Sequence, residues 1–107
     1  MNSFENVEDQ KLATLAVATL KRTGAPQAAA LRDSTGRTYV AISINRAELT
    51  LDAIQAVFTV AMASQISGIE ALVLTGIAQG STGIIHSHSP SASIFHIDES
   101  GAITALR

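Results

Sequence analysis

Apolar residues recur along this chain with a helical period in some segments and with a strand period in others. Between Asn6 and Arg22 they fall every three or four positions, Asn6 is a suitable N-cap, and Gly24 follows the last turn. This segment predicts a helix with one buried stripe. Residues 28–32 and the alternating, β-branched run 38–44 flank a Gly-containing turn, and that combination predicts a β-hairpin.

The second half of the chain predicts a more buried helix and three further strands. Residues 51–64 are apolar on most sides, with Thr50 as the expected cap, so we expect this helix to be covered by the sheet and by another layer or subunit. The continuous apolar run 71–75 is typical of a strand buried on both faces. A polar Gly/Ser-rich loop is expected over 76–93, followed by strands at 93–97 and 102–106. We interpret this order as one α/β domain over residues 1–107, with about five strands and two helices.

Composition and charge exclude several classes of protein. The chain has 107 residues, a formal net charge of −2 and 15% charged residues, which is a poor basis for binding nucleic acid by phosphate neutralisation. Because it has no cysteine, it has neither a thiolate nucleophile nor thiolate ligands for zinc. The polar, acidic N-terminus and the interrupted apolar stretch 49–66 predict no targeting signal, no membrane span and a cytoplasmic location. Only 4% of residues are aromatic, so a core of small side chains is expected to depend on close packing or subunit contacts.

His86 and His88 have the spacing of two metal ligands. If this segment is extended, both imidazoles point to the same side and can meet one metal ion, with His96 or a carboxylate as a third ligand. The alternative, which the Ser-rich surroundings favour, is a pair of exposed histidines in a polar loop. A Ser–His nucleophile pair is a further alternative, but no Gly-x-Ser-x-Gly motif accompanies it. The serines concerned are Ser81, Ser87 and Ser89.

Other polar features point to chemistry less directly. The Gly-rich run 76–83 follows a buried strand, where α/β sheets often bind ligands, but it matches neither G-x-G-x-x-G nor the P-loop, so a flexible connector is favoured. Asp52 is placed to interact favourably with the N-terminal dipole of the second helix. Gln55 is a polar residue on an otherwise apolar helix, which makes it a candidate for lining a pocket.

Four short motifs carry a resemblance to a known family. They are Ala28-Ala29-Ala30-Leu31, Gly36-Arg37-Thr38-Tyr39, Ser43-Ile44-Asn45-Arg46-Ala47 followed by Leu51, and Ile94-Phe95-His96-Ile97-Asp98-Glu99-Ser100-Gly101. They are similar to the G-A-A-L strand, the D-G-R-x-Y turn, the N-x-E-N-A segment and the late strand–turn–strand of the cytidine deaminase family, over about residues 8–106. The resemblance implies a shortened cytidine deaminase-like sandwich, with helices packed on a mixed sheet.

The resemblance also implies a zinc ion, whose ligands are missing from this sequence. Zinc deaminases need Cys or His ligands and a Glu that moves protons on the metal-bound water. Aligning Ala47 and Leu51 with the family implies Ile54 at the first ligand position and Ala56 at the catalytic Glu, and neither side chain can bind zinc or move a proton. Ser91 stands where the family's P-C-x-x-C has its first cysteine, and the helix carrying the second cysteine is expected to be deleted. We therefore expect no catalytic residue and no cofactor.

The family's substrate-reading positions are altered as well. The segment that reads the ribose corresponds to Ser43-Ile44-Asn45, and the aromatic residue of the base pocket corresponds to Ala25. What remains of a pocket is expected to be lined by four polar residues. They are Ser43, Asn45, Gln55 and Ser91.

Two functional hypotheses follow from the resemblance. The favoured one is a non-catalytic, cytidine deaminase-like protein that acts as a structural or protein-interaction module and forms homo-oligomers, as deaminases of this family commonly do. Small proteins resembling this chain occur in actinobacteria, some encoded near a ribosome-assembly GTPase, and this context implies a protein partner. The alternative is a residual nucleoside-binding protein, or a hydrolase or deaminase-like enzyme with a replaced metal site at His86 and His88.

Overall fold

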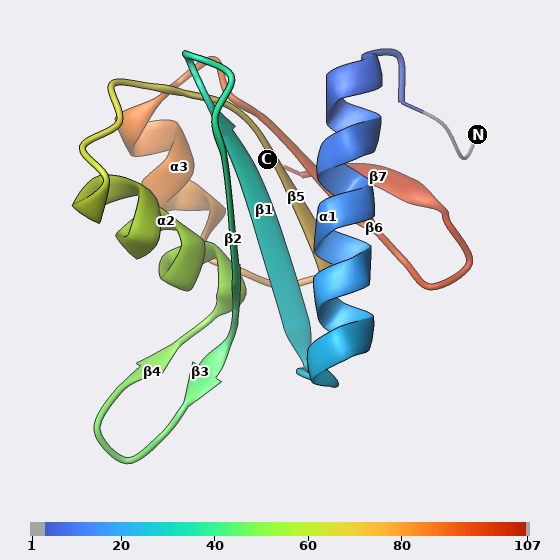
Figure 1. The fold of residues 1–107 in the computed structure, drawn as a ribbon, viewed down its shortest axis with the longest axis vertical. Coiled ribbons are helices and arrows are strands. Elements are labelled where there is room, and N and C mark those ends of the chain that lie inside the picture. Colours follow the sequence, from blue (N-terminus) through green and yellow to red (C-terminus); the bar gives the residue numbers. More distant parts are fainter. Residues whose placement is uncertain (1–3, 107) are drawn as a thin grey trace.

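A five-stranded mixed sheet forms the centre of the computed structural model, which describes residues 4–106 (Figure 1). Its strand order is β2-β1-β5-β6-β7. The strands are β1 (Gln27–Asp33), β2 (Thr38–Ile42), β5 (Ile69–Gly76), β6 (Ser93–Ile97) and β7 (Ile103–Leu106). β5 and β6 are parallel, whereas the other neighbouring pairs in this sheet are antiparallel. The predicted five-stranded mixed sheet is therefore confirmed.

Helices cover both faces of the sheet. α1 (Val7–Thr23) packs on one face, while α2 (Ala53–Ala63) and α3 (Thr82–His88) pack on the other (Figure 1). β1 is buried along its whole length because its alternate residues serve the two cores: Ala30 faces α1, whereas Leu31 faces the side of α2 and α3. The alanines of β1 allow both layers to approach the sheet closely, as expected for a core of small side chains.

The first helix has the ends that its sequence predicts. The Asn6 side chain caps α1 by accepting a hydrogen bond from Glu8 N (2.8 Å). Gly24 ends it with a left-handed backbone (φ 65°), and its N–H donates to Leu20 O (2.9 Å).

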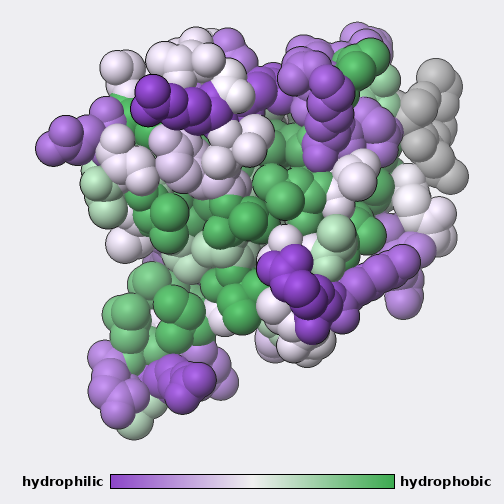
Figure 2. Space-filling model, in the orientation of Figure 1, coloured by the Kyte–Doolittle hydropathy of each residue, from purple (hydrophilic) through white to green (hydrophobic). Residues whose placement is uncertain are grey.

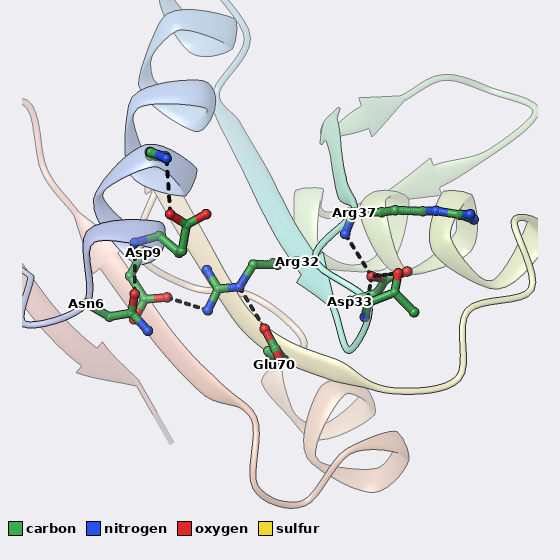
Figure 3. Close-up of polar contacts among 9 residues, drawn as sticks. Asn6, Asp9, Arg32, Asp33, Arg37 and Glu70 are labelled. Carbon is green, nitrogen blue, oxygen red and sulfur yellow. Dashed lines mark hydrogen bonds and ion pairs between the residues drawn. The ribbon is translucent and has the colours of Figure 1, made fainter.

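A buried arginine joins α1 to the sheet (Figure 3). The side chain of Arg32, only 8% exposed, forms an ion pair with Asp9 (2.9 Å) and a hydrogen bond from Nε to Glu70 Oε1 (2.9 Å). Burial lowers the pKa of Arg32, but the interactions with Glu70 and Asp9 outweigh burial, so its pKa is raised and the guanidinium stays charged.

Asp33 organises the turn between β1 and β2. Its carboxylate accepts hydrogen bonds from the N–H and hydroxyl of Thr35 and from Arg37 N, at 2.7–2.9 Å (Figure 3 shows the pair with Arg37). Burial raises the pKa of Asp33, but these hydrogen bonds stabilise the ionised form more strongly and lower the pKa overall. The predicted hairpin is thus held by a side chain as well as by the backbone.

The segment before α2 differs from its prediction. The second helix begins at Ala53 and is capped by Asp52, not by Thr50. Thr50 lies in β4 (Thr50–Leu51), which pairs with β3 (Ile44–Asn45) in a separate two-stranded sheet. Residues 44–51, which we call the projecting ribbon, extend away from the main sheet (Figure 1). The predicted strand 38–44 therefore ends at Ile42, because the chain leaves the main sheet at that point.

The expected loop at 76–93 contains a helix, so the prediction of two helices is wrong by one. α3 forms where the sequence is rich in Gly and Ser because Ile85 is fully buried against α2 and the sheet, and this tertiary contact outweighs low helix propensity. Within residues 4–106, no helix is long and apolar enough to cross a membrane.

Candidate functional site

The starts of α2 and α3 meet at one carboxylate, and we call this place the α2–α3 junction. Asp52 Oδ1 caps α2 by accepting from Gln55 N (2.8 Å), and the Gln55 side chain accepts from Asp52 N (2.9 Å) in return. Asp52 Oδ2 accepts from Ser81 N (3.1 Å) and from Ser81 Oγ (2.6 Å), at the start of α3. One side chain thus joins the starts of two helices, through residues that lie 29 positions apart along the chain.

Gln27, at the start of β1, connects the junction to the sheet. Its side chain is buried, with Oε1 accepting from Ala53 N (2.8 Å) and Nε2 donating to Ile77 O and Gln79 O (2.9 Å each). The first backbone N–H of α2 is therefore satisfied by a buried amide, and the loop that leads into α3 is held by the same side chain.

Apolar packing closes the space beneath these polar groups. Ile54, in the first turn of α2, is fully buried and contacts the loop at Gly80. A Cβ placed on Gly80 would lie only 2.8 Å from Ile54 Cδ1, so the loop approaches α2 too closely to leave a space between them. Chemically, the junction offers one carboxylate, one hydroxyl and amide groups that are bonded to one another.

Of the four residues predicted to line a pocket, Gln55 lies in the junction. Its role there is to complete the cap of α2. Ser43 is adjacent to the junction through its backbone N–H, which donates to Gln27 O (3.2 Å). Asn45 is exposed on the projecting ribbon, and Ser91 is exposed in the turn that follows α3. The structure therefore does not gather these four side chains around one hollow.

His86 and His88 lie on a helix, so the extended geometry expected for a shared metal is wrong. Residues two positions apart on a helix point about 200° apart around its axis and cannot face one ion. His86 Nε2 lies 3.3 Å from Ala92 O, whereas His88 makes an edge contact with Phe58. Within residues 4–106, no three His, Cys, Asp or Glu residues are grouped closely enough to hold a metal ion.

Ser89, the C-cap of α3, contacts His88 in the part of the chain that the structure describes. Ser89 Oγ lies 2.9 Å from His88 Nδ1, and the same oxygen accepts from Ile69 N (2.9 Å) at the start of β5. The hydroxyl is buried and committed to the backbone, which suits a structural role. Ser81 is bound to Asp52, and Ser87 is exposed.

A separate hollow of about 630 Å³ lies on the other face of the sheet, between the end of α1 and the turn after β6. Its apolar walls include Val17, Leu20 and Ile97, and Asp98 stands at its edge. The Ser100 hydroxyl and the Ala102 N–H hold the pKa of Asp98 below its usual range, so this carboxylate is ionised and tied to its own turn. Lys21 and Glu99 also line this hollow.

The comparisons with known proteins agree with this architecture. A sequence model of the cytidine deaminase-like family matches residues 5–101, so the chain belongs to that family. Among solved structures, cytidine deaminase from Burkholderia pseudomallei is similar with a TM-score of 0.74 and 14% identity, covering 91% of this chain and 90% of that one. Cytidine deaminase from Mycobacterium leprae is similar with a TM-score of 0.70 and 16% identity, covering 94% of each chain. No curated protein sequence matches.

The observed helix starts decide whether the residues present fit the zinc ion that the family implies. α2 opens at Asp52, so Ile54 lies inside its first turn, and α3 opens at Ser81. A helix, α3, lies between β5 and β6, but it ends at His88, and Ser91 lies after it, directly before β6. A zinc site needs three or four Cys, His, Asp or Glu ligands, and the junction supplies one carboxylate beside a hydroxyl and an isoleucine. The residues do not fit zinc.

Sequence reasoning missed Gln27 and the bridging role of Asp52. Gln27 is a lone polar residue between Pro26 and an apolar strand, and that isolation is the one signal that could have marked it as a buried hydrogen-bonding group. Asp52 was expected to act only on its own helix dipole. Its second partner, Ser81, became identifiable only once a helix was seen in the expected loop.

Proposed function

We propose that this chain is a non-catalytic member of the cytidine deaminase-like family that acts in the cytoplasm as a structural or protein-interaction module. The observation that carries the proposal is the α2–α3 junction, where Asp52 and Ser81 bind each other and Ile54 fills the space beneath them. A hydrolytic deaminase needs a group that activates water and a group that moves a proton. At this junction the polar groups are hydrogen-bonded to one another and hold the helices together.

Self-association is the interaction that the surface supports best. α2 carries no charged residue, and its outward side includes Val60, which is 43% exposed. The projecting ribbon adds Leu49, which is 50% exposed, and Figure 2 shows apolar residues where the ribbon joins the body and hydrophilic residues at its tip. A two-stranded ribbon alone is marginally stable in water, so a second surface that covers it is favoured.

Charge at the tip of the ribbon favours a second copy of this chain as that surface. Arg46 and Glu48 lie two residues apart and are both exposed. Across a two-fold axis, Arg46 of each copy can face Glu48 of the other, so the same patch is complementary to itself. A protein partner of another kind, such as the ribosome-assembly GTPase implied by the resemblance, is the competing occupant.

Sedimentation velocity tests the self-association. We expect the unaltered chain to sediment as an oligomer and Val60→Lys to sediment as a monomer, because a charged side chain would have to be buried in the contact. Val7→Lys is the matched control, since Val7 is 68% exposed but lies at the start of α1. A monomeric unaltered chain, or equal dissociation by both substitutions, would contradict a contact through α2.

Thermal denaturation with added compounds tests the non-catalytic, non-binding part of the proposal. Cytidine, uridine or zinc that binds the folded state raises its melting temperature, by mass action, in proportion to the logarithm of its concentration. We expect no shift with any of the three. A concentration-dependent rise with a nucleoside would instead support the residual nucleoside-binding protein, and a rise with zinc would contradict the proposal by showing that the folded chain binds a metal ion.

A further inference from the structure

We infer that a hydrogen-bonded bridge through Asp52, in place of a metal ion, holds the starts of α2 and α3 together in this chain. This inference concerns what stabilises the fold and does not depend on the proposed function. It rests on the disagreement between the family's zinc and the residues present at the junction, where one carboxylate accepts from both helices.

Both oxygens of the Asp52 carboxylate are used. Oδ1 serves α2 by accepting from Gln55 N at 2.8 Å, and Oδ2 serves α3 by accepting two hydrogen bonds from Ser81, at 2.6 and 3.1 Å. Hydrogen bonds to an ionised acceptor are shorter and roughly twice as strong as neutral ones. The carboxylate therefore connects two helix starts with charge-assisted bonds.

α3 needs such an attachment. It has seven residues, too few for a helix that is stable by itself. Its N-cap, Ser81, makes no side-chain cap within α3, because the hydroxyl is turned to Asp52. Contacts along its whole length hold the helix, among them the bridge at its start, the buried Ile85 in its middle and Ser89 at its end. Loss of the first contact should release the start of α3 while the rest of the fold persists.

The substitution Asp52→Asn separates the bridge from the cap. Asparagine is as good an N-cap as aspartate, so the bond to Gln55 N can be kept, whereas an amide NH₂ in place of Oδ2 cannot accept from Ser81 N. We expect Asp52→Asn and Ser81→Ala each to raise the unfolding equilibrium constant by roughly three- to tenfold. Ser81→Ala removes the bond from the hydroxyl but keeps the one from Ser81 N, whereas Asp52→Asn replaces the acceptor of both. Because the hydroxyl bond is affected in both variants, the double variant should be less destabilised than the product of the two single effects.

Matched controls identify what the effect means. Asp98 also holds its own turn with three hydrogen bonds to one oxygen but lies at the hollow on the other face of the sheet, so Asp98→Asn combined with Ser81→Ala should show the product of the two single effects. Ser81→Thr keeps the hydroxyl and should restore most of the stability lost in Ser81→Ala. Adding a chelator or zinc to the unaltered chain should leave its melting temperature unchanged.

Amide hydrogen exchange supplies a local measurement should any Asp52 variant fail to fold. In Ser81→Ala, amides in the first turn of α3 should exchange faster, with those of α1 unchanged. The inference is overturned if the Asp52→Asn and Ser81→Ala effects multiply, if α3 exchange is unaltered, or if a chelator lowers the melting temperature and zinc restores it. If the effects of Asp52→Asn and Ser81→Ala on stability multiply and the protein shows no deaminase turnover, only the bridge is rejected. If the two effects are coupled but the protein deaminates cytidine, only the proposed function is rejected.

Discussion

Replacing Ile54 by Val and Gly80 by Ala, separately and together, tests the packing that closes the α2–α3 junction. A Cβ on Gly80 would lie 2.8 Å from Ile54 Cδ1 and 3.2 Å from Ile54 Cγ1, while the next neighbour, on Leu74, is at 3.7 Å. Gly80 has no positive φ, so backbone strain does not contribute. Because Ile54 is fully buried, its Cδ1 cannot move aside without disturbing a closely packed core.

The two substitutions should therefore compensate each other. In the unaltered chain, Gly80→Ala should lower the free energy of unfolding by about 1 kcal/mol, because overpacking outweighs the smaller gain from a less flexible unfolded state. Ile54→Val alone should also cost about 1 kcal/mol, since one buried methyl group is removed. That methyl group is the one that Gly80→Ala would strike, so in the Ile54→Val background Gly80→Ala should be neutral or stabilising, a coupling of roughly 1–2 kcal/mol.

Urea denaturation followed by circular dichroism measures all four proteins of this cycle. Gly83→Ala is the control, because a Cβ there meets no atom within 4 Å, and its effect should be the same in both backgrounds. If Gly80→Ala costs the same with and without the Ile54→Val substitution, the loop does not pack on Ile54 and the junction is not closed as described.

Three further substitutions test other parts of the structure. Asp9→Ala removes a partner of the buried Arg32 and should lower the free energy of unfolding, measured by urea denaturation, by about 2–4 kcal/mol. Lys11→Ala, which breaks an exposed ion pair, should lower it by less than about 0.5 kcal/mol. Equal losses would contradict a buried ion pair. Gly76→Ala should abolish or severely weaken folding, seen by circular dichroism, because φ is 89° and a Cβ would clash with the backbone carbonyl oxygen of Pro26. Gly83→Ala should fold normally. The pKa of Asp33 is lower in the folded state than in the unfolded state, so the ionised carboxylate stabilises the fold above the unfolded-state pKa, and this contribution is lost as the pH falls below about 4. Asp33→Asn should therefore reduce the loss of unfolding free energy on the acid side, measured by urea titrations at several pH values. The same pH dependence in both proteins would contradict this role of Asp33.

The sequence predicted the fold where local pattern and tertiary environment agree. The cap at Asn6, the end at Gly24 and the continuous apolar strand around 71–75 are local signals that the structure bears out. The projecting ribbon and α3 were missed for a physical reason. Both are short, and their conformations depend on contacts made far along the chain, such as the burial of Ile85.

The candidate site was harder to predict than the fold because its residues are joined by long-range bonds. Gln55 was identified as an unusual polar residue, but its partner, Asp52, became clear only from the capping box seen in the structure. Gln27 and Ser81 reach the junction from 26 and 29 residues away from their α2 partners. A spacing rule for His86 and His88 gave the wrong geometry once the segment proved helical, because the direction of a side chain depends on the backbone that carries it.

Metal content and deaminase turnover, measured on one purified sample, test most directly whether this member of the family has lost the chemistry of the cytidine deaminases. The protein is incubated with zinc and desalted, its zinc is counted by elemental analysis, and release of ammonia from cytidine and deoxycytidine is followed. We predict far less than one zinc per chain and no turnover above a protein-free blank. Stoichiometric zinc together with turnover would contradict a junction closed by Asp52, Ser81 and Ile54 and would require a replacement metal site elsewhere in the chain.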